Sequence, residues 1–187
     1  RRRSLHQRRW PCPYAIRKPA DGTVERPGDL VELATLDIRP LPSKIWKQFT
    51  ARDVVSRWDT LELGRRATAS AAAAVLDRLA ERMPFPVRAI SIDNGSEFMA
   101  EFEAACQTRG IRLFVLPPRS PKLLVNDAPA TEIHTEEFYE VTTAEPELEA
   151  FQVELRAWET VYNTIRPHQS LGQRTPAEFL ASLGIDV

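Results

Sequence analysis

Cysteine is scarce in this 187-residue sequence, and long hydrophobic runs are missing. The only two cysteines, Cys12 and Cys106, form neither a disulfide framework nor a C-x-x-C pair, which is typical of a reducing, cytoplasmic setting. No apolar run is long enough to cross a membrane, and the basic start of the chain lacks the apolar core of a secretory signal. We therefore expect a cytoplasmic protein that has no membrane partner.

Acidic residues are absent from the N-terminal end. The first 20 residues contain seven of the 25 Lys and Arg, which leaves 18 basic and 26 acidic side chains, a net charge of −8, in the remainder. A basic segment on an acidic body is typical of a protein that touches a polyanion, although a solvated tail or a linker has the same composition. Prolines and glycines recur up to Gly28, so we interpret residues 1–29 as an arm or linker and residues 30–187 as the core.

Within the core, strand and helix patterns alternate. Apolar and β-branched runs predict strands over residues 30–38, 45–53, 56–64, 87–92 and 111–116. Helical spacing and capping residues predict helices over residues 68–83 (capped by Thr68 or Ser70), from Ser96 to about 109, about 129–140 and about 147–165. This order predicts an α/β fold with a mixed five-stranded sheet and helices on both faces.

Six ordered segments together resemble the integrase core of bacterial insertion-sequence transposases, the DDE branch that is related to retroviral integrases. They are PGDLVELATLD (27–37), KQFTARDVVSRW (47–58), MPFPVRAISIDNGSEF (83–98), RGIRLFVLPPRSPK (109–122), HTEEFYE (134–140) and AWETVYNTIRPHQSLGQRTPAEFL (157–180). The resemblance implies a ribonuclease-H-like fold. It also implies phosphodiester chemistry with Mg²⁺ or Mn²⁺, in which two ions about 3.5–4 Å apart are held by three carboxylates.

The second of the three acids is present. Asp93 follows a predicted buried strand and precedes Gly95 in a predicted tight turn, at the kind of strand end where ligands collect in α/β sheets. The resemblance implies that Asp93 is a catalytic metal ligand. The alternative is an aspartate that only caps the turn.

The first acid is replaced. The family pattern resembles LVQIDTLD, and here LVELATLD has Ala34 at the acidic position. Glu32 shares the strand face of residue 34 but is one strand step of roughly 7 Å away, whereas Asp37 faces the opposite side. We expect neither to replace the missing acid well, and we interpret Asp37 as a structural or surface acid.

The third acid is replaced as well. The family pattern after PPRSPK resembles LNGRVERA, and here LLVNDAPA has Ala128 at that position, or Pro129 if the register slips by one; neither can bind a metal. Asp127 is adjacent and suits a helix N-cap, while Glu132 is four residues on and would share a helical face with residue 128. Glu132 is therefore a further candidate stand-in.

Candidate DNA contacts are separate from the acids. A proline-stiffened loop contains Arg119, Ser120 and Lys122, which suit phosphate contacts, although a solvated loop explains them equally. Asn163, Arg166 and His168 match family positions near the site, and the alternative is a helix end with a structural turn. We interpret three tryptophans and one histidine as structural: Trp46, Trp58, Trp158 and His134.

The resemblance implies DNA integration or transposition in the bacterial cytoplasm. The implied partners are transposon ends, target DNA and further copies of the chain. Since Ala34 and Ala128 replace two acids, we expect little strand-transfer activity, and the alternative function is a catalytically inactive DNA-binding or regulatory remnant. The chain also has no room for the upstream helix-turn-helix of such transposases, so we expect a C-terminal piece of a longer protein.

Overall fold

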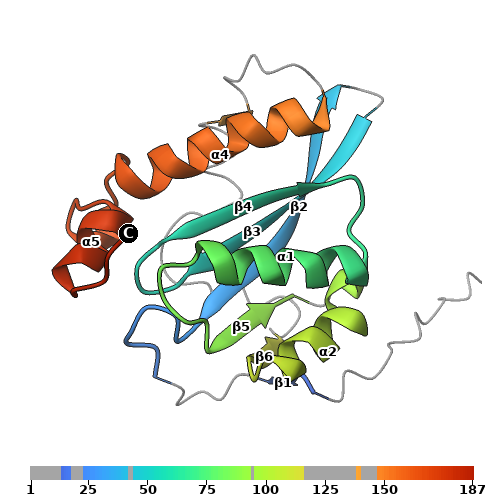
Figure 1. Cartoon of the computed structure of the whole chain (residues 1–187), viewed down its shortest axis with the longest axis horizontal. Coiled ribbons are helices and arrows are strands. Elements are labelled where there is room, and N and C mark those ends of the chain that lie inside the picture. Colours follow the sequence, from blue (N-terminus) through green and yellow to red (C-terminus); the bar gives the residue numbers. More distant parts are fainter. Residues whose placement is uncertain (1–13, 18–22, 42–43, 94, 116–137, 140–146) are drawn as a thin grey trace, which may run out of the picture.

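The computed structural model describes residues 14–17, 23–41, 44–93, 95–115, 138–139 and 147–187, and its centre is a six-stranded sheet (Figure 1). The strands are β1 (Ile16–Arg17), β2 (Val31–Leu41), β3 (Lys44–Asp53), β4 (Asp59–Gly64), β5 (Ala89–Ile92) and β6 (Arg112–Val115). Their order is β1-β6-β5-β2-β3-β4, parallel from β1 to β2 and antiparallel from β2 to β4. The five strands predicted from the sequence are confirmed as β2 to β6.

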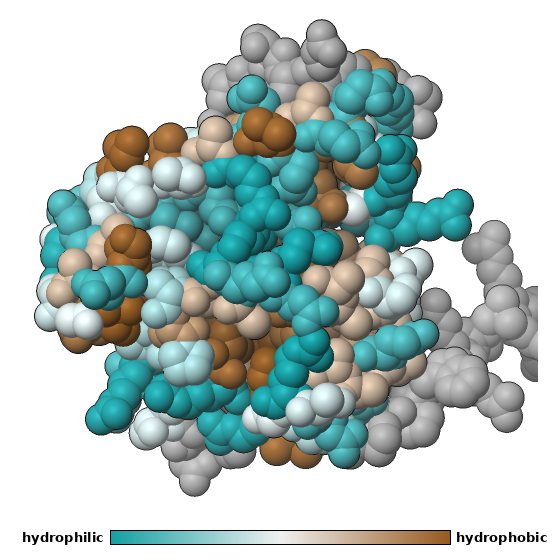
Figure 2. Space-filling model, in the orientation of Figure 1, coloured by the Kyte–Doolittle hydropathy of each residue, from teal (hydrophilic) through white to brown (hydrophobic). Residues whose placement is uncertain are grey.

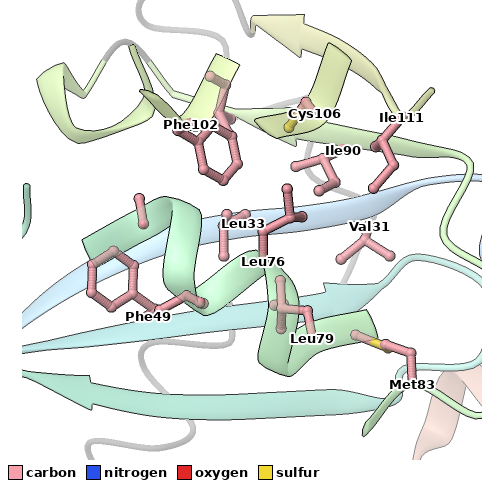
Figure 3. Close-up of a cluster of buried hydrophobic side chains, with 14 of the residues drawn as sticks. Val31, Leu33, Phe49, Leu76, Leu79, Met83, Ile90, Phe102, Cys106 and Ile111 are labelled. Carbon is pink, nitrogen blue, oxygen red and sulfur yellow. The ribbon is translucent and has the colours of Figure 1, made fainter. Parts of the chain in front are cut away.

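One face of the sheet is covered by α1 (Ala69–Arg82) and α2 (Glu101–Thr108) (Figure 1). As predicted, α1 begins after Thr68, whose side chain accepts a hydrogen bond from the Ala71 amide. The apolar face of α1 packs on alternate residues of the central strands, such as Leu33 and Phe49 (Figure 3). This cluster is the larger hydrophobic core, and its burial is the main contribution to the stability of the fold.

The helix predicted to begin at Ser96 is interrupted. Ser96–Phe98 forms a separate 3-10 turn, and α2 starts only at Glu101, after Ala100 with φ 49°. Phe98 and Phe102 are both fully buried and meet edge to face at 5.3 Å, so the break brings both rings into the core. Ser96 is therefore not the N-cap of α2, whereas Gly110 takes the predicted left-handed position after the helix, at φ 66°.

The other face and the β4 edge are covered by α4 (Leu148–Thr164). Its buried side chains join a second cluster with residues of β2, β3 and β4, and the predicted apolar face is confirmed, with Leu148 and Trp158 partly buried. Helices therefore lie on both faces, as predicted. Figure 2 shows hydrophobic surface along the outer side of α4, which exposes Val153, Val161 and Ile165.

The last helix is the short α5 (Pro176–Ser182), which was not predicted from the sequence. Thr175 and Glu178 form a reciprocal capping box, and Pro176 occupies the first turn. The T-P-A-E sequence is a local signal that could have revealed this helix. Within the described part of the chain, no helix is long and apolar enough to span a membrane.

The boundary of the predicted N-terminal arm needs correction. Tyr14 and Ala15 pack against the larger core cluster, and Ile16–Arg17 forms the edge strand β1. A two-residue strand has no hydrophobic alternation for a sequence pattern to detect. Part of the segment interpreted as a linker thus belongs to the folded core.

Candidate functional site

Asp93 lies where the sequence placed it, directly after β5 at the carboxyl end of the strand. It is exposed, and its Oδ1 accepts a hydrogen bond from the Gly95 amide at 2.9 Å. The side chain therefore closes the tight turn predicted for this segment. The residue lies at the edge of the sheet where β5 ends.

The parallel pairing of β2 with β5 brings position 34 next to Asp93. Glu32 pairs with Ser91, and Leu33 pairs with Ile92, so the next residues on the two strands are Ala34 and Asp93. Neighbouring strands are about 4.8 Å apart, and laterally paired residues of parallel strands point to the same face. The gap in the acidic motif and the acid that remains therefore both follow one residue after the Leu33–Ile92 pair.

Glu32 lies on the same face of the sheet as residue 34, but its neighbour there is the buried guanidinium of Arg52. It pairs across the sheet with Arg52 of β3, and its charge helps to raise the pKa of that residue. Burial opposes the charged form of Arg52, yet the Asp59 carboxylate raises the pKa above its ordinary value. Arg52 donates two hydrogen bonds to Asp59, at 2.8 and 2.7 Å, and another to the Tyr162 hydroxyl. Glu32 is thus part of a buried charge network.

Asp37 is a surface acid, as expected. It is exposed on β2 and forms an ion pair with Lys47, its cross-strand partner on β3. The ion pair accounts for the acid without a functional role. Cross-strand pairs of opposite charge stabilise a sheet by about 0.2–1 kcal/mol.

The described residues do not fit a two-metal site. No group of three or more His, Cys, Asp or Glu side chains among them could hold a metal ion. The oxygen ligands that Mg²⁺ requires reduce here to Asp93, because Ala34 has no ligand atom and Glu32 faces Arg52.

Several predicted site residues lie outside the described residues. These are Arg119, Ser120, Lys122, Asp127, Ala128, Glu132 and His134. Their predicted roles stay predictions.

The residues predicted to contact DNA at the end of α4 and directly after it have mainly internal partners. Asn163 is buried and bonds both the amide and the carbonyl of Asp59, at 2.9 and 2.8 Å. His168 is buried, and the centroid of its ring is 4.9 Å from that of Tyr162. The Arg166 guanidinium lies over the Tyr162 ring, 5.5 Å from its centroid. For Asn163 and His168 these contacts favour the alternative of a helix end and structural turn.

The role of α4 at the edge of the sheet was not predicted from the sequence. Three of its side chains accept hydrogen bonds from alternate β4 amides: Gln152 from Leu63 at 2.7 Å, Glu159 from Leu61 at 2.6 Å and Asn163 from Asp59. Their spacing of seven and four residues lies on one helical face, so polar residues at that spacing were the available signal. The helix thereby satisfies an edge that would otherwise be open to another strand.

Glu159 also joins an ion-pair network between α4, β4 and α1. Its carboxylate accepts two hydrogen bonds from Arg82, at 3.0 and 2.9 Å, and Arg82 and Arg156 both contact Glu62. Burial raises the pKa of Glu159 to about 7, against the opposing effect of Arg82. This network holds α4 on the sheet.

The three tryptophans interpreted as structural, Trp46, Trp58 and Trp158, are part of the packing, as predicted. Trp46 is buried against Phe151 with ring centroids 5.5 Å apart, while Trp58 and Trp158 are partly buried against the two core clusters. None of them is an open stacking platform for a base.

Comparison with known proteins agrees with the resemblance found in the sequence. Residues 132–176 match the model of the integrase core domain family. The chain is also similar to a solved chain in "CryoEM structure of simian T-cell lymphotropic virus intasome in complex with PP2A regulatory subunit B56 gamma", with a TM-score of 0.64 and 16% identity. That match covers 82% of this chain and 55% of the solved one, so this chain spans about half the length of its structural relative. No curated protein matches the sequence.

The two matches confirm the resemblance to an integrase core and the predicted fold class. The structural match extends over most of the chain, whereas the family match begins in the segment before α4 and ends at Pro176, the first residue of α5. The part that caps the β4 edge is therefore the part that the family model matches.

Proposed function

We propose that this chain is the core domain of a DDE-type transposase or integrase that acts in DNA integration or transposition. The observation that supports the proposal is the β2–β5 register, in which Ala34 and Asp93 each follow one residue after the Leu33–Ile92 pair, where β5 ends. Two elements that are far apart in sequence thus come together at the position where the resemblance implies the catalytic acids of this family. The match to the integrase core family and the similarity to a chain of a solved intasome support the same proposal.

The residue at position 34 determines whether the domain can bind metal and join DNA strands. An alanine methyl cannot bind a metal, and Glu32 balances the charge of Arg52. We therefore propose that the chain binds DNA, as a homo-oligomer in the bacterial cytoplasm, but joins strands poorly or not at all. Metal dependence is general in the family, and the described residues of this chain lack the ligands for a pair of metal ions.

The inactive alternative is a DNA-binding or regulatory remnant, and Ala34 is the observation that favours it. Calorimetry with Mn²⁺ alone tests whether the chain still binds metal: no saturable heat is expected, and saturable binding would contradict the proposed catalytic deficit. A recombinase core that retains its metal pair binds Mn²⁺ with saturable heat, whereas a remnant does not.

DNA association is tested with a fluorescein-labelled duplex and the full chain. Anisotropy is followed over a range of salt concentrations, because phosphate contacts make the affinity fall as salt rises. Affinity that falls steeply with salt supports the proposal. No binding at low salt would sink it. Strand joining is then assayed on the same duplex with Mg²⁺ and with Mn²⁺, and robust joining by the unaltered chain would refute the predicted catalytic deficit.

A further inference from the structure

A buried chain of hydrogen bonds lies on the face of the sheet that α4 covers. The Tyr139 hydroxyl donates to Oε1 of Gln48, and Nε2 of Gln48 donates to the Thr50 hydroxyl at 2.7 Å. Gln48 is 0% exposed and Thr50 is 2% exposed. Polar side chains are costly to bury unless hydrogen bonds satisfy them, so these three side chains have a defined arrangement.

The direction of the hydrogen bonds is fixed by the chemistry of the groups. An amide oxygen accepts and does not donate, so the Tyr139 hydroxyl is the donor to Gln48. An amide nitrogen donates and does not accept, so the Thr50 oxygen is the acceptor. Burial raises the pKa of the Tyr139 phenol, which therefore keeps its proton. Each group thus donates to the next one, and the chain of hydrogen bonds ends on Thr50.

The hydroxyl proton of Thr50 is the last donor of this chain. Among the described residues, the Thr50 side chain has no hydrogen-bond partner besides Gln48. A hydroxyl that accepts one hydrogen bond becomes a better donor, because each bond in such a chain polarises the next. An acceptor placed next to Thr50 would therefore complete the chain.

The residue next to Thr50 on β2 is Ala34, its direct partner in the antiparallel register. The Cβ atoms of such a pair are about 4.5–5.5 Å apart, and both side chains point to the same face of the sheet. A carboxylate at position 34 would be within reach of the Thr50 hydroxyl, whereas the alanine methyl accepts no hydrogen bond. The last donor is thus directed at the position where the first acid of the family motif is replaced.

The apolar surroundings do not account for this polar chain. Gln48 pairs with Leu36 on β2 and with Leu63 on β4. Leu63 and Trp46 belong to the second hydrophobic cluster, against which Tyr139 also packs. Replacing both partners of a buried hydrogen bond with apolar groups of the same shape is often nearly neutral. Packing of this cluster therefore does not require an amide at position 48 or a hydroxyl at position 50.

We propose that Thr50 is a positioning residue for an acid at position 34, and that its hydroxyl, held by Gln48 and Tyr139, is oriented to donate a hydrogen bond to a carboxylate there. The inference rests on the proposed function, because a DDE-type core is what calls for an acid at this position. Ala34 then lacks the carboxylate, while the buried groups that would orient it are still in place. A single substitution at position 34 is therefore sufficient to create an oriented metal ligand near Asp93.

The hydrogen bond between positions 34 and 50 is tested first, without metal or DNA. Thr50→Val removes the hydroxyl at nearly constant shape, and it is introduced into the unaltered chain and into Ala34→Asp. In the unaltered chain it removes the bond from Gln48, and in Ala34→Asp it also removes the bond to the new carboxylate. We expect the urea midpoint to fall about twice as far in Ala34→Asp as in the unaltered chain. If Ala34→Asp does not fold, Ala34→Asn offers an uncharged acceptor for the same comparison.

Thr60→Val is the matched control. Thr60 is also fully buried, but it pairs with Ala51 on the opposite face of the sheet, which α1 covers. Its hydroxyl has no hydrogen-bond partner in the described part of the chain. We expect Thr60→Val to change the urea midpoint equally with and without the acid at position 34. An equal fall for Thr50→Val in the two backgrounds would overturn the proposal, because the hydroxyl would then act in the core alone.

The consequence for metal binding is measured by Mn²⁺ calorimetry on Ala34→Asp. We expect Thr50→Val to weaken Mn²⁺ binding about tenfold in this background, Thr50→Ser to restore most of the affinity, and Thr60→Val to leave it unchanged. Equal affinities with and without the Thr50 hydroxyl would overturn its positioning role. If Ala34→Asp binds no Mn²⁺ while the difference in urea midpoints remains, the hydrogen bond is supported and the metal site of the proposed function fails.

Discussion

Ala34 and Asp93 follow the last paired residues, Leu33 and Ile92, of two adjacent parallel strands. A methyl group therefore lies one strand spacing from the acid that remains. The missing acid can therefore be tested directly, because the single substitution Ala34→Asp would place a second carboxylate near that of Asp93.

Ala34→Asp is expected to make the stability of the protein depend on metal. Without a divalent ion the two carboxylates repel each other, which costs about 1 kcal/mol near the surface. Mg²⁺ or Mn²⁺ would offset this cost, so the melting temperature should rise on adding metal. Ala34→Asn has the same shape without the charge and is the control. An equal metal response in the two variants would contradict the predicted geometry.

Gly28→Ala is expected to lower the free energy of unfolding by more than about 2 kcal/mol. Gly28 has φ 83°, and an added Cβ would lie 2.2 Å from the Pro86 carbonyl oxygen. Gly110→Ala is the matched control, since its φ is 66° but its Cβ would meet nothing within 4 Å. Both substitutions introduce backbone strain at a positive φ, but only Gly28→Ala adds the clash with the Pro86 carbonyl, so the difference between the two urea midpoints measures the clash alone. Equal midpoints would mean that the loop moves to accommodate the methyl group.

Asn163→Ala is expected to destabilise the fold rather than to weaken DNA binding. It removes the partners of the Asp59 amide and carbonyl, and each buried polar group left unpaired costs about 1–3 kcal/mol. Thr164→Ala, at an exposed neighbouring position, is the control. Chemical denaturation measures the first effect and anisotropy at a temperature where both variants are folded measures the second. A stable variant with weak DNA binding would instead support the predicted DNA contact.

Glu159 is expected to make the protein less stable as the pH rises from about 5 to 8. Its pKa is raised from 4.5 to about 7 in the folded state, so folded protein holds this proton more tightly than unfolded protein does. The stability from this group is complete below pH 4.5 and is lost as the pH rises through about 7. Urea midpoints across this range measure the effect. Glu159→Gln should remove this part of the slope, whereas Glu154→Gln, exposed on the same helix, should leave it unchanged; identical slopes in all three proteins would refute the assignment.

Local patterns were sufficient for most of the elements. The alanine-rich run with Thr68 before it is strongly helical by itself, and apolar runs mark the buried strands. The same patterns failed at Ala100, where core packing of two phenylalanines overrides a continuous helical sequence. They also failed at Ile16–Arg17, because two residues bear no periodicity.

The candidate site divides in the same way. A motif comparison along the chain was enough to locate Asp93 and to find Ala34 in place of an acid, because both depend on residue identity at a known spacing. Their neighbouring places in the sheet register, the pairing of Glu32 with Arg52, and the hydrogen bond from the Tyr14 amide to Glu103 were decided only by the folded sheet. These partners are distant in sequence, and strand register and burial, which no local pattern encodes, bring them together.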